Sequence, residues 1–149
     1  MKIVTLNEKR LVGFRVVCET LEGYQQEIPR ALEKLTQHIE DINHVVNSNT
    51  IYGIFKVDAV PEEDGYWKCV EVETYDNTPH DMEQIILKQG SYAALDYDGP
   101  PQRIQLAYES LHQWSKGNNL ERNLNAWTIE KYEKIESSRI ECTIYDPIK

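Results

Sequence analysis

The stretch SYAALDYDGPPQRIQLAYESLHQW, residues 91–114, changes its hydrophobic period once along its length. Its first nine residues are typical of a strand, and after two prolines the apolar residues Ile104, Leu111 and Trp114 recur at helical spacing. Two strand-like segments follow, AWTIEKYE at 126–133 and RIECTIYD at 139–146. The second half of the chain is therefore predicted to have the order strand, helix, strand, strand.

The first half of the chain repeats this order. Its four segments lie at residues 10–20 (strand), 28–42 (helix), 51–57 (strand) and 66–75 (strand). Both helical patterns are expected to begin with proline, Pro29 in the first and Pro100 with Pro101 in the second. The repeat is an architectural prediction, because the two halves share little sequence identity.

We therefore predict an α+β fold and a single domain, residues 1–149. Two pseudo-symmetric strand-helix-strand-strand units, about 10–75 and 90–146, are expected to form an antiparallel sheet with a central ligand cleft between them. Aligning the two strand pairs makes Phe55 in the first unit equivalent to Glu130 in the second. One unit would then supply an apolar wall where the other supplies a charge.

The charge of the chain argues against some partners. It has 16 Lys and Arg against 25 Asp and Glu, a net charge of -9, which is the wrong sign for a phosphate backbone. We expect no direct nucleic acid binding, and a preference for cationic small molecules, although solubility alone also explains an acidic chain. We expect neither a secretory signal nor a membrane span, and therefore a cytoplasmic protein with three cysteines as reduced core residues.

Motifs for cofactor, metal or nucleophile chemistry are missing. The sequence has no glycine-rich phosphate loop, dinucleotide fingerprint, two-histidine zinc helix or serine nucleophile elbow. The segment DYDGPP at 96–101 lacks the later acidic positions of a calcium loop, and the four histidines show no ligand spacing. We expect no cofactor, no metal and no catalytic residue.

Glu130 raises the main functional question of the sequence. Strand alternation in AWTIEKYE places Trp127 and Ile129 on one face and Thr128, Glu130 and Tyr132 on the other. A strand glutamate of this kind is either solvated on an open face or buried with a partner. Nine tyrosines and three tryptophans favour the second reading, since aromatic faces and a carboxylate together bind organic cations.

Several segments resemble a known family, the GyrI-like small-molecule-binding domain, which is also the effector-binding module of AraC-type and MerR-type multidrug regulators. The segments are YGIF at 52–55, GSYAALDYDGPP at 90–101, YESLHQW at 108–114, WTIEKYE at 127–133 and IYDPIK at 144–149. The resemblance implies two strand-helix-strand-strand units around a cleft. It also implies that Glu130 in the penultimate strand and Tyr145 in the last strand bind the ligand.

Other ligand-binding residues are expected from the strand pattern and the predicted cleft. They are Phe55, Trp67 and Tyr92, and also Tyr132, which shares the face of Glu130. The multidrug regulators join this module to a helix-turn-helix domain, which this sequence lacks. We therefore expect a stand-alone sensor or sequestering protein.

Three functions follow as alternatives. The first is non-enzymatic binding of cationic or amphipathic small molecules in an aromatic and acidic cleft. The second is hydrolysis of strained-ring alkylating compounds, with Glu130 positioning water and Tyr145 stabilising the leaving group. The third is inhibition of gyrase, or contact with a separate regulator, through a protein interface.

Overall fold

A computed structural model describes the whole chain, residues 1–149, as one sheet with two α-helices. The eight strands are β1 (Lys2–Leu6), β2 (Lys9–Val16), β3 (Ile51–Lys56), β4 (Tyr66–Val72), β5 (Glu83–Leu87), β6 (Gly90–Gly99), β7 (Trp127–Ile135) and β8 (Ile140–Ile148). The helices are α1 (Leu21–His38) and α2 (Ile104–Gly117), and three-residue 3-10 helices begin at Ile39, Pro61 and Pro101. The predicted α+β class is confirmed.

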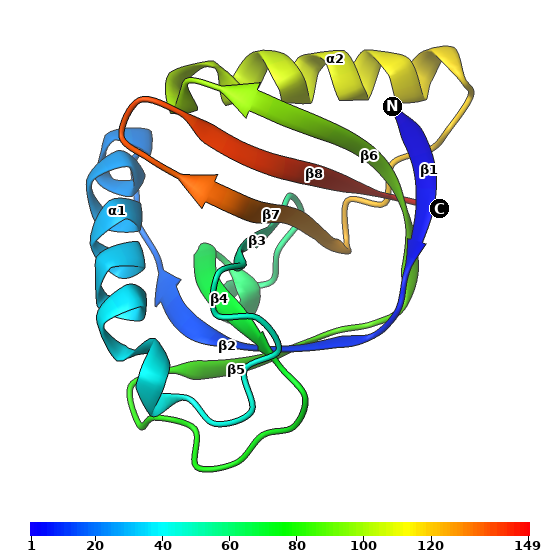
Figure 1. Cartoon of the computed structure of the whole chain (residues 1–149). Coiled ribbons are helices and arrows are strands. Elements are labelled where there is room, and N and C mark those ends of the chain that lie inside the picture. The colour runs from blue at the N-terminus through cyan, green and yellow to red at the C-terminus, as the bar shows by residue number, and fades with distance from the viewer.

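The sheet is antiparallel throughout and has the order β1-β6-β8-β7-β3-β4-β2-β5. This order is symmetric about the β7–β3 pair. From the edges inwards, β1 corresponds to β5, β6 to β2, β8 to β4 and β7 to β3. Figure 1 shows the sheet as a curved layer, with α1 beside β2 and α2 beside β6. The pseudo-symmetric arrangement places the centre of the sheet between the two helices.

Two features of the repeat were not predicted. A further strand precedes each predicted unit, β1 before the first and β5 before the second. These strands are exchanged between the halves, since β1 pairs with β6 and β5 pairs with β2. The single-domain assignment and the unit boundaries 10–75 and 90–146 stay predictions.

The predicted start of the first helix is wrong. Helix α1 begins at Leu21, eight residues before Pro29, and the side-chain oxygen of Thr20 accepts a hydrogen bond from the backbone N–H of Gly23 at 3.0 Å. This N-cap starts the helix earlier than the proline signal indicated, so Pro29 lies inside the helix. Neither α-helix is long and apolar enough to cross a membrane.

The hydrophobic core lies on both faces of the sheet. On one face Leu35 of α1 packs on Val12 and Val70, and Leu111 of α2 packs on Ile144. The opposite face carries a third cluster, with Leu11, Ile54 and Ile129 among its members. We call these the helix face and the open face of the sheet.

One buried ion pair fixes the loop before β7 to the last strand. Asp146 on β8 is 1% exposed, and Arg122 donates to both of its carboxylate oxygens at 2.8 and 3.1 Å. Such a two-bonded pair satisfies a carboxylate that would be costly to bury alone.

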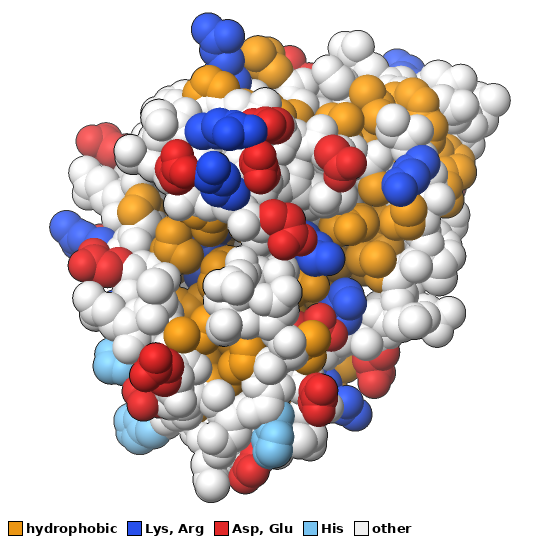
Figure 2. Space-filling view, viewed as in Figure 1, with side chains coloured by type: hydrophobic (Ala, Val, Ile, Leu, Met, Phe, Trp, Pro, Cys, Tyr) orange, Lys and Arg blue, Asp and Glu red, His pale blue; other side chains and the backbone are white.

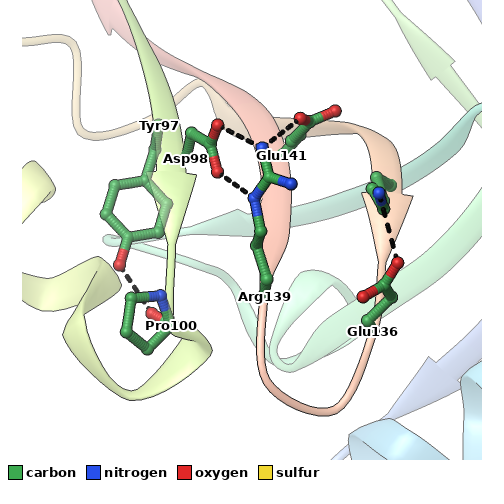
Figure 3. A network of polar contacts seen from close by, with 7 residues as sticks. Tyr97, Asp98, Pro100, Glu136, Arg139 and Glu141 are labelled. Atoms are coloured by element: carbon green, nitrogen blue, oxygen red, sulfur yellow. Dashed lines mark hydrogen bonds and ion pairs between the residues drawn. The ribbon is translucent and has the colours of Figure 1, made fainter.

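Charges on the surface are mixed in sign. Figure 2 shows acidic and basic side chains next to one another on the face in view. At the β7–β8 hairpin, Arg139 donates to both oxygens of Asp98 at 2.6 Å and to Glu141 at 2.7 Å (Figure 3). Asp98 belongs to β6 and Glu141 to β8, so this exposed network joins the hairpin turn to two neighbouring strands.

Candidate functional site

Glu130 is buried at the centre of the sheet, on the helix face. It is 6% exposed, and its strand neighbours Thr128 and Tyr132 are buried on the same face. Trp127 and Ile129 belong to the core of the open face, as the alternation predicted. The interpretation of Glu130 as a solvated residue is therefore wrong. A buried carboxylate requires partners for its charge among the residues around it.

Three tyrosine hydroxyls satisfy the carboxylate of Glu130. Oε1 accepts from Tyr66 on β4 at 2.6 Å and from Tyr132 on β7 at 2.8 Å, while Oε2 accepts from Tyr108 on α2 at 2.6 Å. A carboxylate only accepts hydrogen bonds, so three O–H donors suit its ionised form. Burial, followed by the charge of Glu130, raises the pKa of all three phenols well above the ordinary value.

Gly53 makes room for this arrangement. It lies on β3 directly opposite Glu130 on β7 and opposite Lys68 on β4. A Cβ atom at this position would overlap the hydroxyl of Tyr66 and would lie 3.0 Å from Oε1 of Glu130. The phenol therefore reaches the carboxylate by passing over a residue that has no side chain.

Lys68 places a positive charge beside the same groups. The residue is 4% exposed, and its Nζ donates to the hydroxyl of Tyr66 at 3.1 Å and lies 3.9 Å from the ring centroid of Tyr132. Burial lowers the pKa of Lys68 to about 8, although the charge of Glu130 opposes the shift. We call Glu130, Tyr66, Lys68, Tyr108 and Tyr132 the Glu130 cluster.

Phe55 lies over the outer side of the cluster. Its ring stacks with that of Tyr66 at a centroid distance of 6.2 Å and lies at the same distance, tilted, from the ring of Tyr108. Phe55 and Tyr108 are half-buried, whereas Glu130 is buried beneath them. These two rings therefore stand between the carboxylate and solvent. Phe55 pairs with Thr128 across the strands, and it shares the helix face with Glu130.

The structure divides the expected ligand-binding residues between the two faces of the sheet. Phe55 and Tyr132 lie with Glu130 on the helix face, but the other three expected residues belong to the core of the open face. Trp67 packs edge-on against Trp127 at 5.0 Å, and Tyr92 packs edge-on against Tyr145 at 6.1 Å. The expectation that Trp67, Tyr92 and Tyr145 line one cleft with Glu130 needs correction, because successive strand residues point to opposite faces.

A pocket of about 340 Å³ opens on the other side of the sheet from Glu130. Tyr92 and Trp127 line it, together with Lys56 and Lys88. Its lining contains none of the residues of the Glu130 cluster. The separation also removes the geometric basis for Glu130 and Tyr145 acting together in hydrolysis, since Tyr145 belongs to the open-face core.

Four residues of the site were missed in the sequence: Gly53, Tyr66, Lys68 and Tyr108. Tyr66 and Lys68 alternate with the selected Trp67, so the correct strand phase in YWKCVEV would have identified them. Gly53 had a signal as well, because a glycine inside a strand marks a close approach of another group. Tyr108 fits the apolar spacing of its helix and had no separate signal.

Comparisons with known proteins agree with the observed fold. A family model described as the GyrI-like small molecule binding domain matches residues 1–149. None of the curated proteins matches the chain in sequence.

Three solved structures have a similar fold. SAV2435 bound to tetraphenylphosphonium has a TM-score of 0.67 at 22% identity, covering 99% of this chain and 93% of that one. The EcmrR C-terminal domain has a TM-score of 0.72 at 15% identity, covering 99% and 96%. A hydrolase from Listeria innocua has a TM-score of 0.56 at 10% identity, covering 99% and 91%.

Proposed function

Because the chain belongs to the family of GyrI-like small-molecule-binding domains, we propose that it binds hydrophobic organic cations at the Glu130 cluster. The observation that carries the proposal is a buried carboxylate held by three phenolic hydroxyls between the two helices. One structure of similar fold, SAV2435, is bound to such a cation, tetraphenylphosphonium. A role as a sensor or sequestering protein in the cytoplasm is part of the proposal.

The chemistry of the cluster favours a cation with aromatic groups. A carboxylate in a site of low dielectric attracts positive charge more strongly than one in water. The rings of Tyr66, Tyr108 and Phe55 offer aromatic faces, which attract a delocalised cation through their quadrupoles. Stacking on rings needs no exact hydrogen-bond match, so the site selects charge and tolerates differences in ligand shape.

Entry of a ligand requires Phe55 and Tyr108 to move. Both are half-buried and cover Glu130, and Tyr108 is carried by α2 rather than by the sheet. A ligand that displaces the phenol of Tyr108 removes one hydrogen bond from Oε2 and can supply its own charge in exchange. The site is therefore proposed to open between the helices, at the edge formed by these two rings.

The other functions have less support. Hydrolysis was expected to use Glu130 with Tyr145, and Tyr145 lies in the open-face core. Gyrase inhibition by imitation of DNA charge would need a surface of one sign, whereas acidic and basic groups are intermixed on the face that Figure 2 shows. Small-molecule binding is the function that the described residues favour.

Calorimetric titration of tetraphenylphosphonium tests the proposal. At pH 8, Glu130→Gln keeps the shape of the side chain but removes its charge, and is expected to weaken binding by on the order of 2 kcal/mol. Glu133→Gln is the matched control, since Glu133 lies on the same strand with its side chain 53% exposed. It should leave the affinity unchanged.

A neutral ligand separates charge recognition from loss of the site. Triphenylphosphine oxide keeps three phenyl rings and carries no net charge. Its affinity should fall much less than that of the cation in Glu130→Gln. Equal losses for the two ligands, or no loss for either, would contradict the proposal.

A further inference from the structure

The Glu130 cluster already contains a cation. Nζ of Lys68 lies 3.9 Å from the ring centroid of Tyr132 and 5.2 Å from that of Tyr66, and it donates to the hydroxyl that Tyr66 directs at Glu130. Aromatic faces beside a carboxylate are the features expected to hold an organic cation. The ammonium of Lys68 thus makes the contacts that the proposed ligand would make.

We propose that Lys68 is the resident cation of the Glu130 cluster, and that an organic cation binds there only as Lys68 gives up its proton. The inference rests on the proposed function, because it concerns the same site. It predicts a protein that releases about one proton for each cation bound at pH 6, and progressively fewer as the pH rises past 8. Affinity for a permanent cation would then depend on pH even though the ligand itself does not titrate.

The location of Lys68 keeps its ammonium from leaving the cluster. The residue lies in the middle of β4, with Phe14 of β2 as its partner on one side and Gly53 of β3 on the other. Both partners are buried, and Lys68 is itself only 4% exposed. Moving Nζ to solvent would require the core between β2 and β3 to open.

Releasing the proton costs less affinity than holding two cations together. At an effective dielectric constant of about 20, the repulsion between two unit charges about 5 Å apart would weaken binding by roughly a few hundredfold. Deprotonating an amine whose pKa is about 8 costs only about tenfold at pH 7. The neutral amine remains able to accept or donate a hydrogen bond at Tyr66.

Four other titratable groups around Lys68 do not change charge between pH 6 and 9. Tyr66, Tyr108 and Tyr132 have pKa values raised well above the ordinary value, and burial raises the pKa of Cys142 on β8 to about 12. These four groups keep their protons between pH 6 and 9.

Two further groups lie near Lys68, one on the same strand and one on helix α1. Cys69, the next residue of β4, has its pKa raised by burial and also stays protonated. From α1, Nζ of Lys34 lies 4.5 Å from the ring centroid of Phe14, the residue that pairs with Lys68. Replacing Lys68 leaves Lys34 and Cys69 in place. A comparison of the natural protein with a Lys68 variant therefore cancels any effect of Lys34 and Cys69 on ligand affinity.

The experiment is titration of the intact chain with tetraphenylphosphonium at pH 6, 7, 8 and 9, in two buffers of different ionisation enthalpy to count released protons. For the natural protein we expect affinity to rise about 100-fold from pH 6 to pH 9 and to level off above pH 8, with about one proton released at pH 6. Lys68→Met should bind about 100-fold more tightly than the natural protein at pH 6, with no proton release. Lys68→Gln should behave in the same way and serves if the methionine variant fails to fold.

The results separate this inference from the proposed function. If the natural protein and both variants bind with the same pH profile, the Lys68 inference is wrong while cation binding stands. If none of the three binds the probe at any pH, both the inference and the proposed function are wrong. Binding by the variants alone at pH 6 would support the inference.

Discussion

Replacing Gly53 by alanine is expected to disrupt the Glu130 cluster without changing any group that bonds within it. The new Cβ would overlap the hydroxyl of Tyr66 and lie 2.6 Å from its Cζ, so the ring of Tyr66 must move away from Glu130. Overpacking of this kind costs about 1 to 3 kcal/mol. Loss of the charge-assisted bond from Tyr66 to Glu130 adds about 1.5 to 3 kcal/mol.

Alanine also reduces the freedom of the unfolded chain, which offsets about 0.4 to 1 kcal/mol of that loss. We expect Gly53→Ala to lower the free energy of unfolding by about 3 kcal/mol, measured by urea denaturation. Gly117→Ala is the matched control, because nothing lies within 4 Å of a Cβ at that position. It should leave stability within about 1 kcal/mol of the natural protein. A Gly53→Ala protein as stable as this control would refute the packing argument.

Three further substitutions test other parts of the structure. Tyr66→Phe removes one hydroxyl from Glu130 and should lower the free energy of unfolding by about 1.5 to 3 kcal/mol; a change below about 0.5 kcal/mol would contradict the hydrogen bond. Lys68 has a folded pKa of about 8, below that of the unfolded chain, so its charging destabilises the fold below pH 8, and this effect is relieved as pH rises toward 10.5. Lys68→Met removes this destabilising charge, so its free energy of unfolding should exceed that of the natural protein by an amount that shrinks by about 2 kcal/mol from pH 7 to pH 9.5 in urea titrations. A difference that does not depend on pH would contradict the lowered pKa of Lys68. Arg122→Met leaves the buried carboxylate of Asp146 without its two-bonded partner and should cost about 3 to 5 kcal/mol, whereas an unchanged melting temperature would show that the pair is not needed.

The hydrophobic periods of the sequence were sufficient to predict the class and order of the main elements. The alternation in AWTIEKYE correctly separated Trp127 and Ile129 from Glu130, because a strand has only two faces. Strand β1 and strand β5 were missed. They are five residues each, lie at the two edges of the sheet and pair with the opposite half, so their formation depends on contacts distant in sequence.

The site was less predictable than the fold. Trp67 was expected at the site from the strand pattern and the predicted cleft, yet its neighbours Tyr66 and Lys68 face Glu130. The choice between the two phases depends on which face the helices cover, and strand alternation alone does not state this. The contact of Tyr108 with Glu130 joins a helix to a strand 22 residues away, and no local pattern encodes it.

A crystal structure of the protein with tetraphenylphosphonium, grown at pH 9, would locate the ligand. We predict the phosphonium on the helix face beside Glu130, within about 6 Å of the ring centroids of Tyr66 or Tyr108, with Phe55 displaced. The pocket on the open face, lined by Tyr92 and Trp127, offers the alternative location. A cation bound only there, with the three phenols still bonded to Glu130, would contradict the assignment of the Glu130 cluster as the binding site.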